Sequence, residues 1–201
     1  MSFIQLSSLL LFKIFLVSYI FKLVIMHRMS GIKALVLARG DKGKSVDTTE
    51  TVVRISTFVW GAFWLLESLF HHLIEGVVPN LFTSQNVQNV GLFIILSGLV
   101  FFISSMITMK NSWRVGIDKT TKTELITNGV YKYSRNPAFV GFDLMFIGLF
   151  LTFPNIATFF ICIINIFAIH SLILQEEKHL EGMLLEDYVV YRKRTPRYLF
   201  F

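Results

Sequence analysis

The chain lacks most of what a disulfide-linked or soluble protein of its size contains. Its 201 residues include a single cysteine, Cys162, which excludes an intrachain disulfide and a site built from several cysteines. Charged residues make up 16% of the chain, whereas soluble domains carry about 25%. Hydrophobic residues reach 54%. These scarcities exclude a secreted disulfide scaffold and disfavour a soluble enzyme.

Acidic residues are also scarce, since 13 Asp and Glu face 19 Lys and Arg and leave a formal net charge of +6. A nucleic-acid partner is not expected, because the basic residues lie between apolar runs and form no basic face with interleaved aromatics. Basic flanks of apolar runs set membrane topology and contact anionic lipid headgroups. The charge pattern therefore predicts contact with membrane lipid.

The apolar residues gather into long runs, which predict an all-α, polytopic membrane protein with about five transmembrane helices. A helix of about 20 apolar residues crosses the bilayer core. The runs cover residues 3–26, 52–74, 87–109, 137–153 and 156–174. Pro154-Asn155 separates the last two, so they should pair as an antiparallel hairpin. The first run has no basic start or cleavage site of a signal peptide and is expected to be retained.

Lys and Arg concentrate in three connections, after the first, third and fifth runs, and are absent from the other two. The positive-inside rule then places the N-terminus outside and the C-terminus in the cytoplasm of a bacterial-type cell membrane. In the first connection, 40–45 matches a phosphate loop only superficially, and a flexible basic loop is expected. Its apolar residues 32–38 are expected to lie in the membrane interface.

Two further patterns concern packing. Gly91 and Gly98 lie seven residues apart in the third run and predict a close helix–helix seam. After the fifth run, apolar and aromatic residues recur at helical spacing and predict an amphipathic cytoplasmic helix near the membrane surface. These residues are Leu180, Leu184, Tyr188 and Tyr191.

One helical face offers possible metal ligands. Glu67, His71 and Glu75 are spaced at i, i+4 and i+8, with His72 beside them. We favour a helix end leaving the membrane and predict no metal site. A metal- or haem-binding membrane protein is the weaker alternative.

Candidate ligand-binding residues lie where a polar segment leads into the fourth apolar run. Asn136 and Pro137 suit the N-cap and first position of a helix, and a helix start beside Arg135 also favours an anion. The hairpin should bring Glu176 and Glu177 back to this point. Two readings stay open from the residues alone: a solvated helix end paired with a cation, or a carboxylate that faces a cationic or amine-bearing ligand.

Residues 125–141, L-I-T-N-G-V-Y-K-Y-S-R-N-P-A-F-V-G, precede the Glu pair and the block E-D-Y-V-V-Y-R-K-R-T-P-R at 186–197. In this order the blocks resemble the isoprenylcysteine carboxyl methyltransferase family and the related phospholipid N-methyltransferases, from about Trp113 onward. The resemblance implies S-adenosylmethionine-dependent methyl transfer at the cytoplasmic face. The acceptor would be a prenylcysteine-type carboxylate or a lipid amine. The chain would be one domain, with spans in 1–110 and the cofactor-binding half in 111–201.

The resemblance also implies the site residues. Arg135, Asn136 and Glu177 would be catalytic. The cofactor would be bound by Thr123, Glu124, Leu125, Ile126, Tyr131, Asn136, Pro137, Ala138, Phe139 and Glu176.

Four positions depart from the family pattern, so the acceptor can differ from a prenylcysteine carboxylate. Asn136 replaces a histidine, Phe139 a tyrosine, Leu185 a glycine and Leu172 a substrate-associated arginine. A non-catalytic membrane scaffold of the same fold is the main alternative to an enzyme.

Overall fold

The computed structural model describes residues 1–31, 34–40, 42–118 and 124–199. The chain is 77% helical, and no strand occurs in the described ranges, which confirms the all-α prediction. Two short 3₁₀ turns, η1 (Lys110–Ser112) and η2 (Gly129–Lys132), lie in the second long connection. The helices are α1 (Phe3–Ser30), α2 (Lys44–Glu75), α3 (Gln85–Met109), α4 (Pro137–Thr152) and α5 (Ile156–Arg194).

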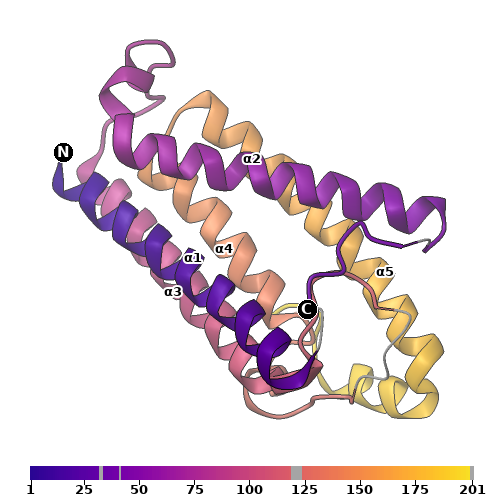
Figure 1. Cartoon of the computed structure of the whole chain (residues 1–201). Helices are drawn as coiled ribbons and strands as arrows, with labels where there is room; N and C mark the ends of the chain where they lie inside the picture. Colours follow the sequence, from indigo (N-terminus) through magenta and orange to yellow (C-terminus); the bar gives the residue numbers. More distant parts are fainter. Residues whose placement is uncertain (32–33, 41, 119–123, 200–201) are drawn as a thin grey trace.

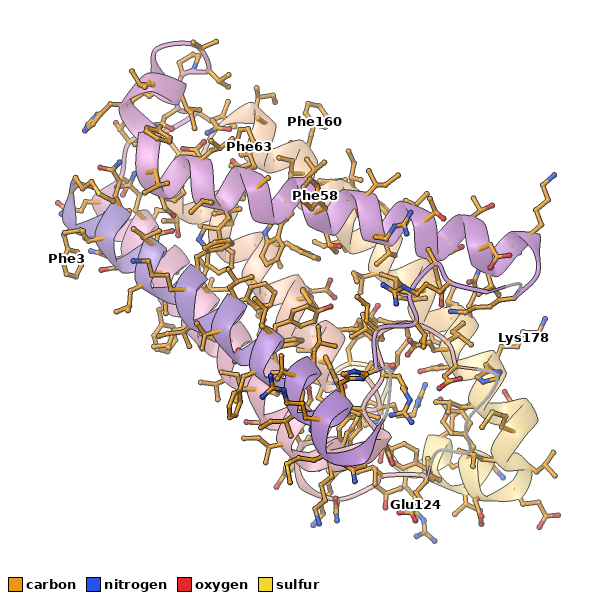
Figure 2. All side chains as sticks on the ribbon, viewed as in Figure 1. Phe3, Phe58, Phe63, Glu124, Phe160 and Lys178 are labelled. Atoms are coloured by element: carbon orange, nitrogen blue, oxygen red, sulfur yellow. The ribbon has the colours of Figure 1, made fainter. Side chains whose placement is uncertain are left out.

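Four helices, α1, α2, α3 and α5, are long and apolar enough to cross a membrane. The fifth predicted span, α4, has 16 residues and measures about 24 Å, less than the hydrocarbon core of about 30 Å. Phe58 and Phe160 lie on the outer surfaces of α2 and α5, with 76% and 55% of their area exposed (Figure 2). Apolar surface of this kind suits contact with lipid. The protein is an integral membrane protein.

The helices form a bundle in which α4 lies at the centre (Figure 1). It packs most extensively on α3 and also contacts α5, while α2 packs on α5 and α1 packs on α2 and α3. Asn155 accepts a hydrogen bond from Thr158 N at 3.0 Å and caps α5. The antiparallel hairpin predicted from Pro154-Asn155 is therefore confirmed. It also returns the far part of α5 to the end of the bundle where α4 begins.

The predicted glycine seam joins α3 to α4. A Cβ on Gly98 would lie 2.5 Å from Gly141 O, and a Cβ on Gly141 would lie 2.6 Å from Gly98 O. Gly91 approaches Gly148 and the backbone of Thr152 in the same way. Because neither backbone leaves room for a side chain, the seam fixes the depth of α4 against α3.

The first basic connection is shorter than predicted, and contacts with a buried carboxylate fix its position. Helix α2 begins at Lys44, eight residues before the expected start of the second run. Lys42 forms a buried ion pair with Glu50 at 2.7 Å, and Glu50 also accepts hydrogen bonds from Ala38 N and Ile117 N. The expectation of a flexible loop is wrong here, because a carboxylate inside the protein anchors it.

Residues 34–38, part of the stretch expected in the membrane interface, pack inside the protein, and residues 32 and 33 lie outside the described ranges. Ala34 and Leu37 are buried in the core, and Leu35 pairs with Val115 in an isolated parallel bridge. The apolar side chains that suggested contact with lipid headgroups instead pack under the second long connection. The two long connections thus pack against each other and cover this end of the bundle.

The predicted C-terminal amphipathic helix is the last part of α5, which continues past residue 174 to Arg194. Leu185 interrupts it with φ 46° and ψ −121°, a conformation that favours glycine, and this is the position where the resembling family has glycine. Beyond it, Tyr188 and Tyr191 are buried. The predicted face is therefore buried at Tyr188 and Tyr191 and half-buried at Leu180 and Leu184, and the kink at Leu185 sets the last turns apart from the rest of α5.

Leu185→Gly should stabilise the protein. Leu185 is 67% exposed, so the substitution removes little packing and relieves a strained backbone. We expect a gain of about 1 kcal/mol, measured as a higher unfolding midpoint in detergent. Met183→Gly is the control, since Met183 is helical and glycine there should cost about 1 kcal/mol. Equal losses from both substitutions would contradict the argument.

Candidate functional site

A cavity of about 740 Å³ opens beneath the two long connections. Side chains from all five helices and from the two long connections line it, and most of them are apolar. A volume of this size is typical of pockets for cofactors and drug-sized ligands. We call it the main cavity.

The main cavity has two chemically different ends. Its polar end is lined by Glu124, Asn136 and Glu176, at the side of the bundle where the basic connections gather. Its apolar end lies between α1 and α2 and is lined by aromatic side chains such as Phe15 and Trp60. The cavity can therefore hold a polar group and an apolar group at the same time.

Most of the residues expected to bind the cofactor meet at the polar end. Pro137 is buried at the start of α4 beside them, and Thr123 lies outside the described residues. The residues that line the main cavity are Glu124, Leu125, Ile126, Tyr131, Asn136, Ala138, Phe139 and Glu176.

Glu176 lines the main cavity with no hydrogen-bond partner among the described residues. Leaving a carboxylate in largely apolar surroundings without a partner is costly, so such a group is expected to meet a hydrogen-bond donor or a cation. The geometry therefore favours a ligand that brings one. This agrees with the second interpretation that the sequence left open, a carboxylate that faces a cationic or amine-bearing ligand.

Tyr131 lies beside this carboxylate. Burial raises the pKa of the Tyr131 hydroxyl far above its ordinary value, and the nearby Glu176 and Tyr191 add to the effect. The hydroxyl therefore keeps its proton and can donate a hydrogen bond. Tyr191 holds the segment in place, because its hydroxyl donates to Tyr131 O at 2.6 Å.

Glu177 agrees with the first interpretation in its pairing with cations, but it is buried and not solvated. It accepts hydrogen bonds from Arg135 Nη2 at 3.0 Å, Arg197 Nη2 at 2.9 Å and Asn136 Nδ2 at 2.9 Å. The hydrogen bond to Glu177 raises the pKa of Arg197, which stays charged. We call these four residues the Glu177 clamp. Among them, Arg135 and Asn136 line the main cavity, whereas Glu177 is not among its described lining residues.

The clamp fastens the C-terminal segment to the start of α4. Arg135 N donates to Pro196 O at 2.9 Å, and Ser134 Oγ donates to Arg197 O at 3.0 Å. Arg135 Nη1 also donates to Thr195 O at 2.6 Å. Residues about 60 positions apart are thereby held in one surface at the polar end.

Asn136 does not cap α4 as expected. Its side-chain amide instead donates to Glu177, and no side chain caps the first turn of the helix. The amides of that turn remain suited to an anion, since a helix start carries unpaired donors and partial positive charge.

The sequence did not reveal the contribution of α2 to the cavity. Val53, Thr57, Trp60 and Gly61 line it, and a Cβ on Gly61 would meet open space. Their i, i+4, i+7 and i+8 spacing marks a single helical face. That signal was present, but in an apolar run it resembles ordinary packing. The N-terminal spans therefore build part of the site.

The possible metal ligands lie at the opposite end of the bundle. His71 Nδ1 lies 2.8 Å from Glu67 Oε2, and Asn155 donates to Glu67 Oε1 at 2.6 Å. These contacts bind α2 to the α4–α5 turn. Within the described residues, no group of three or more His, Cys, Asp or Glu side chains is arranged to hold a metal ion.

Glu177→Gln should destabilise the protein strongly. The substitution leaves two guanidinium groups without their carboxylate, and removing one partner of a buried pair costs about 3 kcal/mol. Glu181→Gln is the matched control, because Glu181 pairs with Arg192 on the surface, where such a pair contributes under about 1 kcal/mol. Unfolding midpoints in detergent compare the two, and equal shifts would contradict a central role for Glu177.

Residues 87–186 match the family model for phospholipid methyltransferases. The match begins in α3, earlier than the resemblance from Trp113 onward, and includes Tyr131, Asn136 and Glu176 of the polar end. None of the curated proteins matches the chain. Through this domain, the chain belongs to the phospholipid methyltransferase family of membrane methyltransferases.

Proposed function

We propose that the protein transfers methyl groups from S-adenosylmethionine to a lipophilic acceptor, a lipid amine or a prenylcysteine-type carboxylate. The observation that carries the proposal is Glu176, a carboxylate that lines the main cavity and has no hydrogen-bond partner in the described part of the chain. S-adenosylmethionine brings an amine and ribose hydroxyls that such a carboxylate can accept hydrogen bonds from. When bound, it supplies a methyl group already activated by a sulfonium charge.

Other residues of the polar end suit the same ligand. Tyr131 and Phe139 offer aromatic faces for an adenine ring or for a cationic sulfur. The uncapped first turn of α4, with Ala138, suits a carboxylate. The Glu177 clamp would position Arg135 and Asn136 beside this ligand, so we assign Glu177 a positioning role.

The apolar end suits the tail of the acceptor. Leu16 of α1 and Phe58 of α2 line the cavity and are also exposed on the outer surface, which supports entry from the bilayer between these helices. The N-terminal spans and the C-terminal half would then act as one domain. The Lys and Arg of the long connections favour a cytoplasmic position for the polar end, with the N-terminus outside.

The protein would contribute mainly alignment of the two substrates and exclusion of water. A carboxylate acceptor needs no base, whereas an amine must lose a proton. His179 lines the cavity with Nε2 3.2 Å from Asp118 O. Because a carbonyl only accepts, Nε2 carries the hydrogen in the neutral ring and Nδ1 is left as an acceptor.

Glu176→Gln should weaken binding of S-adenosylmethionine by tenfold or more, because a hydrogen bond to a charged group contributes about 1.5–3 kcal/mol. Calorimetry on detergent-purified protein measures the affinity. Glu186→Gln removes an exposed carboxylate from the same helix and should leave the affinity unchanged. Absence of binding to the unsubstituted protein would refute the proposal.

Gly61→Phe should impair the apolar end of the main cavity and leave the polar end unchanged. The new side chain would enter the open space at the apolar end, so methyl transfer to extracted lipid should fall by tenfold or more while affinity for S-adenosylmethionine stays within about twofold. Gly182→Phe is the control, since Gly182 is helical, exposed and also unobstructed. Full activity in Gly61→Phe would show that the acceptor does not use this end.

A further inference from the structure

A second concave site lies where the C-terminal segment folds back against α5. Its volume is about 650 Å³. We call it the basic cup. It is lined by Arg135, His170, Arg192, Lys193, Arg194, Thr195, Pro196, Arg197 and Tyr198.

The basic cup carries a large excess of positive charge. Five of its lining residues are Arg or Lys, and no acidic residue lines it within the described part of the chain. Glu177 pairs with Arg135 and Arg197, and Glu181 pairs with Arg192. Lys193 and Arg194 are exposed and form no ion pair with any described residue. Their charge favours an anionic ligand.

The cup also borders an apolar surface of α5. Its inner wall is formed by His170, whose Nδ1 lies 2.6 Å from the Tyr198 hydroxyl. Phe167 and Leu174 precede and follow His170 by three and four residues, so all three share one side of the helix. Both apolar side chains are exposed, and Ile163 extends the strip one turn further. A ligand in the cup therefore finds an apolar surface directly beside it.

We propose that the basic cup binds the phosphate of an anionic membrane phospholipid, whose acyl chain lies along Ile163, Phe167 and Leu174. A free phosphate would use the cations but not the apolar strip, so the combination favours a lipid. The lipid would be distinct from the methyl acceptor, which the main cavity holds. This site does not depend on the proposed function.

The bound lipid would also strengthen the Glu177 clamp. Arg135 lines both the cup and the main cavity, and its Nη1 donates to Arg192 O and Thr195 O. An anion in the cup would hold Arg192 to Arg197 against the start of α4. Lipid binding should therefore raise the unfolding midpoint as well as occupy the surface.

The test measures binding of short-chain phosphatidylglycerol, short-chain phosphatidylcholine and inorganic phosphate to the full chain in a neutral detergent. Thermal unfolding and native mass spectrometry report stabilisation and retained lipid. We expect phosphatidylglycerol to bind best and to raise the midpoint. The double variant Lys193→Gln/Arg194→Gln should weaken its binding about tenfold or more, since each cation near an anionic headgroup adds to the attraction.

The control is Lys132→Gln/Lys178→Gln, which removes the same charge from exposed positions outside the cup, as Figure 2 shows for Lys178. It should retain binding within about twofold. Equal losses in both double variants would overturn the proposal in favour of diffuse attraction. Equal binding of inorganic phosphate would overturn the assignment to a lipid. No preference for phosphatidylglycerol over phosphatidylcholine would refute an anion site.

Discussion

Glu177 forms the interaction on which the polar end of the protein depends. Its carboxylate accepts hydrogen bonds from Arg135, Arg197 and Asn136, which come from the start of α4 and from the C-terminal segment. A carboxylate near a bilayer is costly unless cations and donors satisfy it. Once this requirement is met, the C-terminal segment is fastened across the bundle. The main cavity and the basic cup then share Arg135 in their walls.

The depth of the site is set by a second constraint, the glycine seam between α3 and α4. Because Gly98 and Gly141 each face the carbonyl of the other, α4 is fixed against α3. Helix α4 is also too short to cross the bilayer alone. The start of α4 consequently lies inside the protein, where both long connections cover it. The first turn of α4 therefore borders the main cavity.

Two adjacent glutamates have different surroundings, and this difference defines the candidate site. Glu177 accepts hydrogen bonds from three residues, whereas Glu176 lines the cavity without a hydrogen-bond partner among the described residues. Neighbouring residues on a helix point about 100° apart. One therefore serves the framework and the other is available to a ligand. The apolar end contributed by α1 and α2 extends the same cavity toward the lipid.

The sequence by itself determined the helical membrane class, the hairpin at Pro154-Asn155 and the segments that meet at the site, because apolar run length, turn residues and ordered motifs are local signals. It also identified Gly91 and Gly98 as packing positions. Only the tertiary structure decided that Glu177 pairs with cations while Glu176 lines the cavity. It also decided that Lys42 and Glu50 form an ion pair near the early start of α2, and that Asn136 donates a hydrogen bond to Glu177. These outcomes depend on partners distant in the chain. Hydrophobic pattern predicts which segments are buried, but pairing of polar groups depends on geometry that arises only when the helices pack.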